Sequence, residues 1–517
     1  MPGPKDTFYV TTPIYYVNDV PHIGHAYTTV AADVLARWRR LCGDRVHFLT
    51  GTDEHGENVA RAAAKRGMGP QDHVDDISPR FREMMSLLHI SNDDFIRTTE
   101  PRHTARVREF MQRLYDQGDI YLDVYRGSYC VSCEAYYTAE ELVDGDCCPV
   151  HRRPVEQREQ ENYFFRLSQY APRLLAAYAG DDSFVQPTVR RNEVRSFVEA
   201  GLQDVSVTRT SFEWGVPVPW DDAHVFYVWF DALLNYVTAV GYGADEASFA
   251  RRWPADVHLI GKDLVRFHCV YWPAMLLAAG LPLPRKVFAH GFLLVGGQKM
   301  SKTNATGIRP AELVEHFGLD CYRYYFLREL SFGQDGSFSW ESMEARYTTD
   351  LANDLGNLAN RVLNMVASYF DGVVPDPGGD PADPPGEAEA ALSADWRSAV
   401  QGMAAFDRLD FKKGLEELWV LVGGVNRYIE SRAPWALNRR GASGDLGRCL
   451  YTCLDALRVI AVLCGPVMPD AAAALWVKLG IGEPLDAQRL PAAATPGLLP
   501  AGITTTRGDL LFPKLEE

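Results

Sequence analysis

The stretch "TFYVTTPIYYVNDVPHIGHAYTTVAADVLARWRRLCGDRVHFL", from Thr7 to Leu49, decides the fold. Its first residues, Thr7–Thr12, are β-branched and aromatic, which favours a strand. From about Gly24 to Cys42 the apolar residues recur every three or four positions, as in a helix packed on one face. A second apolar run, Val46–Leu49, predicts the next strand. Strand, helix and strand in this order indicate parallel strands joined by a helical crossover.

The same alternation continues to a helix ending near Gly67 and returns at Asp256–Gly280 and Arg285–Val295. We therefore predict an α/β fold with a doubly wound, Rossmann-like parallel sheet. Between about Tyr115 and Asp222 the rhythm stops and cysteines cluster, which indicates an inserted domain. After about Asp350 the pattern becomes helical, and the Pro- and Gly-rich stretch Asp371–Ala390 predicts a flexible loop between helices.

Bulk composition describes an acidic, globular, multidomain chain of 517 residues with a net charge of −16. This charge argues against a protein that simply coats nucleic acid, although a local basic surface is not excluded. The most apolar stretch, Cys269–Leu281, contains Pro273 and is too short to span a bilayer. The first twelve residues lack the apolar core of a secretory signal, and ten cysteines in so long a chain do not form a disulfide framework. We expect a cytoplasmic protein with no membrane segment.

His22, Gly24 and His25 follow the first predicted strand, where the next helix begins. In an open parallel sheet, ligands bind beyond the carboxyl ends of the strands. A helix N-terminus there offers free N–H groups to phosphate, and the glycine lets a flat ligand approach the backbone. Two surface histidines in an ordinary helix turn are the alternative interpretation.

A second motif, "GGQKMSKT" at Gly296–Thr303, follows the strand at Val287–Ala289. Lys299 and Lys302 lie in a glycine-bounded loop that could close over a polyphosphate. A lysine there is a point charge suited to a departing pyrophosphate. An exposed basic turn is the alternative.

Paired metal-ligand spacings occur in the inserted segment. Cys130 and Cys133 form one Cys-x-x-Cys pair, and Cys148 and His151 form a Cys-x-x-His pair. This spacing is typical of two knuckles that close a tetrahedral zinc site. Cys147 is a spare thiol beside Cys148 and leaves the third ligand open on spacing alone.

The "HIGH" and "KMSKT" motifs together resemble the signature pair of the class I aminoacyl-tRNA synthetases. Thr303 stands where the family normally has Ser and keeps the hydroxyl. The flanking text resembles the bacterial methionyl-tRNA synthetase family from about residue 7 to the closing "LLFPKLEE". The segments that carry this resemblance are "TPIYYVNDVPHIGHAYT", "FLTGTDEHG", "HVFYVWFDALLNY", "LIGKDLVRFHCVYWPAML" and "HGFLLVGGQKMSKT".

The resemblance implies ATP-dependent ligation of L-methionine to tRNA(Met) through methionyl-adenylate, with release of AMP and pyrophosphate. It also implies the domain borders. Residues 1–115 and 225–297 would be the two halves of the catalytic domain, 116–224 the zinc-knuckle insertion, 298–350 the KMSKS loop and stem-contact region, and 351–517 the α-helical anticodon-binding domain.

Site residues are carried over from the same resemblance. His22, His25, Lys299 and Lys302 would be catalytic, and ATP would be bound by His22, Gly24, His25, Asp263 and Lys302, with Mg²⁺ on its phosphates. The methionine site would comprise Ile14, Tyr16, Asp53, Trp229, Ala232, Leu233, Tyr236, Leu264, Phe267 and His268.

The residues themselves fit this substrate. Asp53 ends the second strand and is placed to hold an ammonium group, although it also fits a helix cap. The aromatic residues around Trp229 and Phe267 recur at helical spacing, which is typical of plain core. An aromatic pocket nevertheless suits a thioether, which is soft and packs against ring edges.

For the metal, the resemblance favours Cys148 over Cys147 and implies one structural Zn²⁺ held by Cys130, Cys133, Cys148 and His151. For tRNA, it assigns anticodon recognition to Asn357, Arg361 and Trp435. Asn357 and Arg361 share a helix face, and an aromatic plane with polar neighbours suits unstacked loop bases. Ordinary bundle packing is the alternative.

Three other functions were weighed. Class I synthetases for leucine, isoleucine or valine need a large editing domain, for which the insertion has no room, and the cysteine enzyme uses zinc as a substrate ligand. A small-molecule adenylyltransferase would not need the helical bundle, and a noncatalytic tRNA-binding protein would not need both intact motifs. We expect a monomer, because the sequence stops directly after the bundle.

Overall fold

The computed structural model describes residues 6–133, 135–137, 139, 141–295, 298–299, 308–378 and 386–515. The chain forms two compact units, Met1–Pro21 with Val46–His290, and His22–Arg45 with Gly291–Glu517. Each unit is described by itself below. Within the described ranges, no helix is long and apolar enough to cross a membrane.

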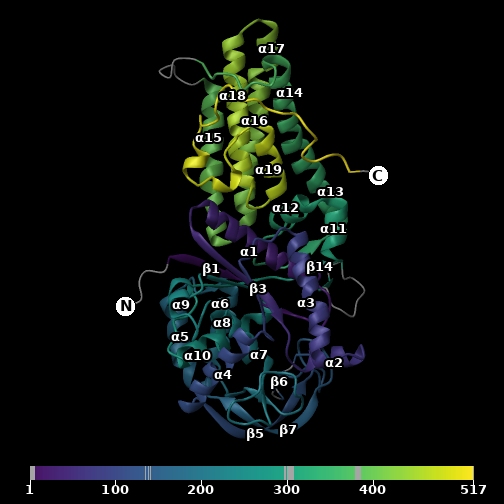
Figure 1. The fold of residues 1–517 in the computed structure, drawn as a ribbon, viewed down its shortest axis with the longest axis vertical. Coiled ribbons are helices and arrows are strands. Elements are labelled where there is room, and N and C mark those ends of the chain that lie inside the picture. Colours follow the sequence, from purple (N-terminus) through teal and green to yellow (C-terminus); the bar gives the residue numbers. More distant parts are fainter. Residues whose placement is uncertain are drawn as a thin grey trace. The chain divides into compact units, whose positions relative to one another are not determined.

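A parallel sheet is the centre of the first unit (Figure 1). Its strands in the described part of the chain are β1 (Thr7–Thr11), β2 (Tyr15–Tyr16), β3 (Arg45–Asp53), β4 (Asp94–Arg97), β8 (Val185–Gln186), β12 (Val257–Gly261) and β13 (Val287–His290). The strands are almost entirely buried, as expected of a parallel sheet covered on both faces.

The strand order is the doubly wound order that the sequence predicts. β4, β3, β1, β12 and β13 are neighbours in this order, and every printed pairing among them is parallel. The order of the chain reverses between β1 and β12, where ligands bind in folds of this type. The predicted strands at Thr7–Thr12, Val46–Leu49 and Val287–Ala289 are confirmed.

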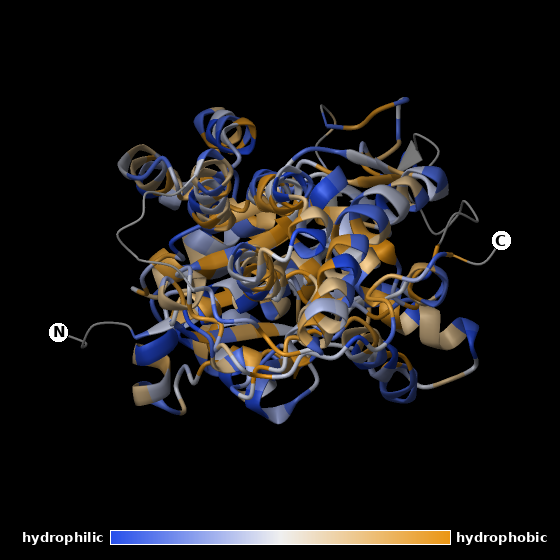
Figure 2. Ribbon diagram, turned by 90° about the horizontal axis from the view of Figure 1, so that it is seen from above, coloured by the Kyte–Doolittle hydropathy of each residue, from blue (hydrophilic) through white to orange (hydrophobic). Residues whose placement is uncertain are grey.

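Helices surround this sheet in the first unit. They are α2 (Glu57–Lys65), α3 (Pro70–Leu87), α4 (Pro101–Asp116), α5 (Ala171–Gly180), α6 (Thr188–Glu199), α7 (Val228–Ala232), α8 (Asn235–Thr238), α9 (Glu246–Arg252) and α10 (Trp272–Ala278), with short turns η1 (Leu167–Tyr170), η2 (Lys262–Leu264) and η3 (Phe267–Tyr271). Most helices carry hydrophilic and hydrophobic residues together, as amphipathic helices do (Figure 2).

The predicted insertion contains an antiparallel sheet of β6 (Ala135–Tyr137), β5 (Ile120–Cys130), β7 (Glu156–Phe165) and β9 (Val205–Ser206), in that order. A two-stranded sheet of β10 (Thr208–Arg209) and β11 (Val225–Phe226) follows it. The expectation that the strand–helix alternation stops between about Tyr115 and Asp222 is wrong in part, because strand and helix alternate again beyond η1. β8 lies between α5 and α6 and joins the parallel sheet beside β13. A strand of two residues such as β8 is too short to produce a recognisable hydrophobic periodicity in the sequence.

The second unit is mainly helical. Its long helices lie side by side (Figure 1). The helices and short helical turns of the described part of this unit are α1 (Ile23–Leu41), α11 (Pro310–Phe317), α12 (Leu319–Glu329), α13 (Trp340–Arg346), η4 (Tyr347–Gly356), α14 (Asn357–Phe370), α15 (Glu387–Gly402), η5 (Met403–Arg408), α16 (Phe411–Arg432), α17 (Pro434–Arg439), α18 (Ser443–Cys464), α19 (Pro469–Lys478), η6 (Leu485–Ala487) and η7 (Ala492–Ala494). A small sheet pairs β14 (Leu293–Val295) with β15 (Gln298–Lys299) and β16 (Gly336–Phe338).

Helix α1 packs with this second unit although the chain enters it from β1 and leaves it for β3. The Arg323 guanidinium of α12 donates to the Asp33 carboxylate of α1 at 2.6 Å, and both side chains are fully buried. Near the end of α1, the Trp38 indole and Arg39 donate to Asp407. The last turn of α1 is therefore bound to the bundle through polar as well as apolar contacts.

The predicted loop Asp371–Ala390 is shorter than expected. Val373 forms an isolated antiparallel bridge with Thr504, and α15 already begins at Glu387. Glu387 and Glu389 in the first turn favour this start, because acidic side chains there interact well with the helix dipole.

Candidate active site and metal site

The two histidines of the "HIGH" motif form the N-terminal cap of α1. The His22 Nδ1 atom accepts from the Gly24 backbone N–H at 3.0 Å, and the His25 Nδ1 atom accepts from the His22 backbone N–H at 3.2 Å. This reciprocal arrangement is a capping box, built from imidazoles instead of the usual Ser and Glu. The ring centroids lie 3.9 Å apart.

The cap also fixes the tautomer of both rings. A ring nitrogen that accepts a hydrogen bond carries no proton, so in a neutral imidazole the proton sits on Nε2. Each ring can therefore present an Nε2–H donor away from the backbone that its Nδ1 atom binds. This is the donor arrangement that phosphate oxygens need.

Most of the lysine motif falls outside the described residues. Lys302, with Met300, Ser301 and Thr303, is not described, and of Lys299 only the backbone is, as the end of β15 paired with β14. The roles predicted for these lysines stay predictions.

The residues assigned to methionine all belong to the first unit, and they come from the segment after β1, the end of β3, the helices α7 and α8 that follow β11, and the turns after β12. Tyr16 of β2 pairs in register with Asp53, the last residue of β3, and Asp53 is buried. Ile14, Tyr16, Trp229, Leu264 and Phe267 are half-buried hydrophobic residues packed on the main core, in which Leu233 and Tyr236 are fully buried. Ile14, Tyr16, Asp53 and Leu264 therefore lie at or just after the carboxyl ends of β1, β3 and β12, where ligands bind in folds of this type.

Tyr236 and His268 form a neutral polar pair within this set. His268 Nδ1 lies 3.1 Å from the Leu264 carbonyl, to which it can only donate, so Nε2 accepts from the Tyr236 hydroxyl at 2.8 Å. Burial lowers the pKa of His268 to about 4, so its ring is uncharged at neutral pH. The pair is polar and uncharged.

A second pair of rings is more exposed. Trp229 and Phe267 are half-buried and stack on each other, with centroids 3.8 Å apart and planes 13° from parallel. Two aromatic faces at the pocket suit a soft thioether.

Neither aromatic segment forms the plain α-helix that spacing suggests. Residues 228–238 split into α7 and α8, because the Asn235 side chain donates to the Ala232 carbonyl and replaces a backbone donor. Phe267–Tyr271 is a π-helical turn, in which the Trp272 N–H reaches the Phe267 carbonyl. Pro273 has no N–H for the carbonyl four residues earlier, which favours this wider turn.

Sequence reasoning missed the polar support behind Tyr236. The His258 ring of β12 packs 4.3 Å from the Tyr236 ring, and its Nε2 atom accepts from the Trp272 indole at 3.3 Å. Its Nδ1–H can then donate to the Thr11 hydroxyl at 2.7 Å. The available signal was a histidine inside the otherwise apolar strand "VHLIG".

Asp263, assigned to ATP, is exposed at the turn η2 that follows β12. Gly261 makes room for it, because a Cβ atom at this glycine would lie 2.6 Å from the Asp263 carboxylate. Any side chain at Gly261 would displace Asp263.

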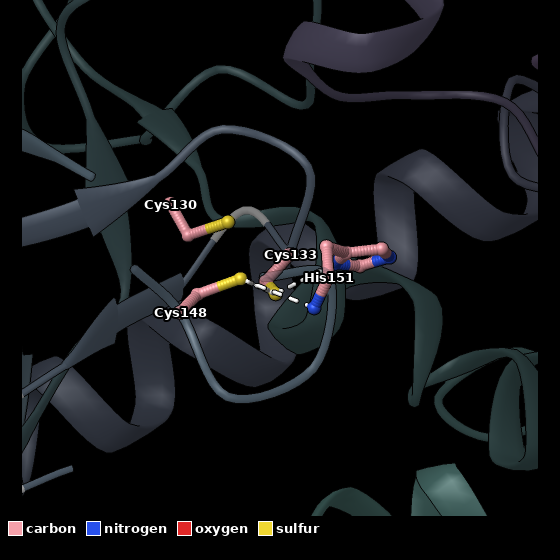
Figure 3. Close-up of side chains that lie close together, drawn as sticks. All are labelled: Cys130, Cys133, Cys148 and His151. Carbon is pink, nitrogen blue, oxygen red and sulfur yellow. Dashed lines mark hydrogen bonds between the residues drawn. The ribbon is translucent and has the colours of Figure 1, made fainter. Parts of the chain in front are cut away.

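The predicted metal ligands come together in the insertion (Figure 3). The ligand atoms of Cys130, Cys133, Cys148 and His151 all lie within 4.8 Å of one another. The sulfurs of Cys133 and Cys148 are 3.8 Å apart, which matches the edge of a zinc tetrahedron with sulfur ligands, about 3.8 Å. The His151 N–H donates to the Cys148 sulfur at 3.2 Å, and Cys147 instead faces Asp146. Cys148, and not Cys147, belongs to the group of four residues that could hold a metal ion.

The predicted anticodon residues lie on the helical bundle. Asn357 is exposed as the first residue of α14, and Arg361, one turn later, forms a 2.5 Å ion pair with Glu430 of α16. Trp435 is half-buried in the first turn of α17, five residues beyond Glu430. A left-handed residue, Ala433, makes the sharp turn between α16 and α17.

Comparison with known proteins covers both units. The family model described as tRNA synthetases class I (M) matches residues 8–154 and 148–363, and the model for the anticodon binding domain of methionyl tRNA ligase matches 377–517. A methionine–tRNA ligase of Streptomyces coelicolor is 52% identical over 99% of this chain and 97% of its own. One from Caldanaerobacter subterraneus is 46% identical over 99% of this chain and 79% of its own.

A solved structure gives the same result. Mycobacterium tuberculosis methionyl-tRNA synthetase in complex with methionyl-adenylate is 44% identical, with a TM-score of 0.93 over 98% of this chain and all of the other. The sequence motifs, the doubly wound sheet and these matches agree, and the chain belongs to the methionine family of class I tRNA synthetases.

Proposed function

We propose that the chain ligates L-methionine to tRNA(Met) in the two steps of its family. The methionine carboxylate attacks the α-phosphorus of ATP, which forms methionyl-adenylate and expels pyrophosphate. A terminal hydroxyl of the tRNA then attacks the methionyl carbonyl, which forms the ester and releases AMP. The carboxylate is already anionic at neutral pH, so the first step needs positioning and charge stabilisation more than a general base.

The observation that carries this proposal is the chemistry of the side chains gathered around the stacked Trp229 and Phe267 rings and the buried Tyr236–His268 pair. A buried carboxylate, Asp53, lies at the end of β3 and suits an ammonium group. The stacked Trp229 and Phe267 rings and the uncharged Tyr236–His268 pair suit a long, soft, uncharged side chain. Charged side chains would be disfavoured against this wall, because no opposite charge on the pair compensates their desolvation.

Phosphate handling is assigned to the first turn of α1 and to the lysine loop. His22 and His25 present Nε2–H donors, and the Gly24 backbone is part of the same cap. We assign Lys302, assisted by Lys299, to the charge that develops on the departing pyrophosphate. Asp263 would contact the ATP ribose, and Mg²⁺ would accompany the ATP phosphates.

Three further points belong to the proposal. The Cys130, Cys133, Cys148 and His151 cluster holds one Zn²⁺, which fixes the fold of the knuckle, since protein ligands fill all four positions. Asn357, Arg361 and Trp435 read the anticodon of tRNA(Met).

The protein acts in the cytoplasm as a monomer. Sedimentation at micromolar concentration would test this against a dimer with a mass near twice 57.8 kDa.

The test is ATP–pyrophosphate exchange scanned across the twenty amino acids. We expect exchange with methionine and at least a hundredfold less with leucine, isoleucine or glutamine. Exchange driven best by another amino acid would reject the proposed substrate, and no exchange at all would reject adenylate formation.

A further inference from the structure

A fully buried carboxylate, Asp231, lies in α7 beside the residues assigned to methionine. Its Oδ2 atom is 2.6 Å from Nδ1 of His55, and its Oδ1 atom is 2.8 Å from Nε2 of His103. The side chains of Asp231 and His103 are completely inaccessible, and that of His55 is 7% exposed. Burial by itself would raise the pKa of Asp231, but the two histidines outweigh it and lower the pKa to about 2.

This one carboxylate joins segments that are far apart in the sequence. His55 follows β3, His103 is in α4 and Asp231 is in α7. The other nitrogen of His103 lies 2.9 Å from the hydroxyl of Thr238, in α8. The network therefore connects the end of β3 with both helices that form the pocket wall.

The β3 side of the network is held in turn by Trp214. Its indole donates to the Glu54 carbonyl at 2.6 Å, its own carbonyl accepts from the Gly56 N–H at 3.1 Å, and its ring packs edge-on against His55. The residues on both sides of His55 are thus bonded to one tryptophan. The imidazole is presented to Asp231 from a fixed loop.

Three members of the network lie two residues away from an assigned methionine contact. His55 lies two positions after Asp53, Asp231 two positions after Trp229, and Thr238 two positions after Tyr236. None of them is itself in the assigned set. These connections tie α7 and α8 to the loop after Asp53, in addition to the contacts that Tyr236 makes with Tyr9 and His258 of the sheet.

We propose that Asp231 is a positioning residue for methionine, which fixes α7 and its pocket residues against the end of β3 by binding His55 and His103 together. The inference rests on the proposed methionine site. A misplacement of about 1 Å between two binding groups is enough to weaken a bound conformer strongly. Loss of the network should therefore act on methionine and spare ATP.

The first test is Asp231→Asn, measured by ATP–pyrophosphate exchange at varied methionine and varied ATP. An amide keeps the shape but removes the negative charge and one of the two acceptors, so one histidine must change its tautomer to stay bonded, and both bonds lose the charge that strengthens them. We expect the KM for methionine to rise at least tenfold and the KM for ATP to change less than twofold.

Matched histidine variants keep the proposal testable if Asp231→Asn does not fold. The amide nitrogen of Asn replaces Nδ1 of His55, and that of Gln replaces Nε2 of His103, so His55→Asn and His103→Gln retain the donor to Asp231. We expect these two variants to stay within about threefold of the wild-type methionine KM. His55→Leu and His103→Leu should raise it at least tenfold.

Asp455→Asn is the control for loss of a buried carboxylate elsewhere. Asp455 of α18 is also buried, and its partners Arg458, Gly497 and Leu499 all belong to the second unit. The Asp455→Asn variant should leave the KM for methionine unchanged. Leucine variants with normal methionine KM, or with methionine and ATP KM raised equally, would overturn the inference. Absence of methionine-dependent exchange in the wild-type protein would instead reject the proposed function.

Discussion

At the N-cap of α1, a serine or asparagine would bind the free backbone N–H groups as well as His22 does. What the imidazole adds is a second nitrogen on the far side of the ring. The Nδ1 atom accepts the Gly24 N–H and caps the helix, and the Nε2–H remains as a donor. A substitution can therefore remove the donor and keep the cap.

His22→Asn makes this separation. Asparagine keeps the cap, so α1 should stay folded, but it has no donor where Nε2–H lies. We expect the rate of adenylate formation to fall by roughly 2–4 kcal/mol of transition-state stabilisation, with methionine affinity little changed. Single-turnover exchange and circular dichroism measure the two effects. Normal exchange in this variant would show that His22 is only a cap.

The buried His268 gives the first unit a pH-dependent stability. Its folded pKa, about 4, lies below the usual 6.5, so between these values the unfolded chain binds a proton that the folded chain does not. This contribution is therefore present at neutral pH and is lost as pH falls from 6.5 towards 4. Between pH 7 and pH 5, the free energy of unfolding of the wild-type protein should fall by about 2 kcal/mol more than that of His268→Gln.

Unfolding of both proteins at pH 7 and pH 5, followed by the transition of the first unit, checks this sign. If the difference in unfolding free energy between wild type and His268→Gln were the same at pH 7 and pH 5, the His268 ring would bind a proton at pH 5 as readily in the folded as in the unfolded chain.

At the scale of single elements, the metal knuckle and the helix α1 are each held by a few contacts that the sequence reveals unequally. The spacing of the ligands predicts the cluster directly, because two ligands with two residues between them can bind the same ion. The Asp33–Arg323 pair joins residues 290 positions apart, and no local pattern indicates it.

The knuckle offers neighbouring thiols as test and control. Cys148→Ser should lose the metal, because Cys148 lies within the cluster, and Cys147→Ser should keep one metal ion per chain. Elemental analysis after gel filtration measures this. Retention of zinc by Cys148→Ser together with its loss from Cys147→Ser would move the ligand by one residue.

Breaking the buried ion pair of α1 should be costly. Arg323→Met leaves the Asp33 carboxylate buried without its main counter-charge, which costs roughly 3–5 kcal/mol of folding free energy. The double variant Asp33→Leu with Arg323→Met removes both charges and should recover most of this loss. Thermal unfolding compares the three proteins, and a double variant no more stable than Arg323→Met would contradict the argument.

For the molecule as a whole, the sequence predicts the α/β and helical regions, a doubly wound parallel sheet and the sites attached to strand ends. These features follow from local periodicity and from rules about parallel sheets. The sequence does not predict the break between α7 and α8, the π-turn at Phe267, or the two-residue strand β8. Each of these depends on a side chain or a partner strand that competes with local propensity.

The same limit applies to the candidate site. Asp53, Trp229 and His268 were predicted because family motifs contain them. His55, Asp231 and His258 were not singled out, although they are buried and polar, because their meaning depends on partners about 14 to 250 residues away in the chain. Burial of a polar group is visible only once the fold is known.

Recognition of tRNA is a property of the whole molecule, since the bundle residues are assigned to the anticodon and the chemistry to the first unit and α1. Trp435→Ala should lower aminoacylation about tenfold or more, because base–aromatic stacking is worth about 1–3 kcal/mol. ATP–pyrophosphate exchange, which needs no tRNA, should stay normal. Loss of both activities, or an unfolded variant, would make Trp435 a core residue.

The packing of α1 has a consequence for how this protein can be divided. By sequence, α1 lies between two strands of the sheet, but its polar partners belong to the second unit: the buried Arg323 and the exposed Asp407. A shortened version that stops before the bundle would carry the "HIGH" turn on a helix stripped of those partners. Swapping bundles between related enzymes would likewise mismatch this helix unless its inward-facing residues were exchanged too. Any division of this protein that is meant to keep α1 folded must therefore leave α1 together with the bundle.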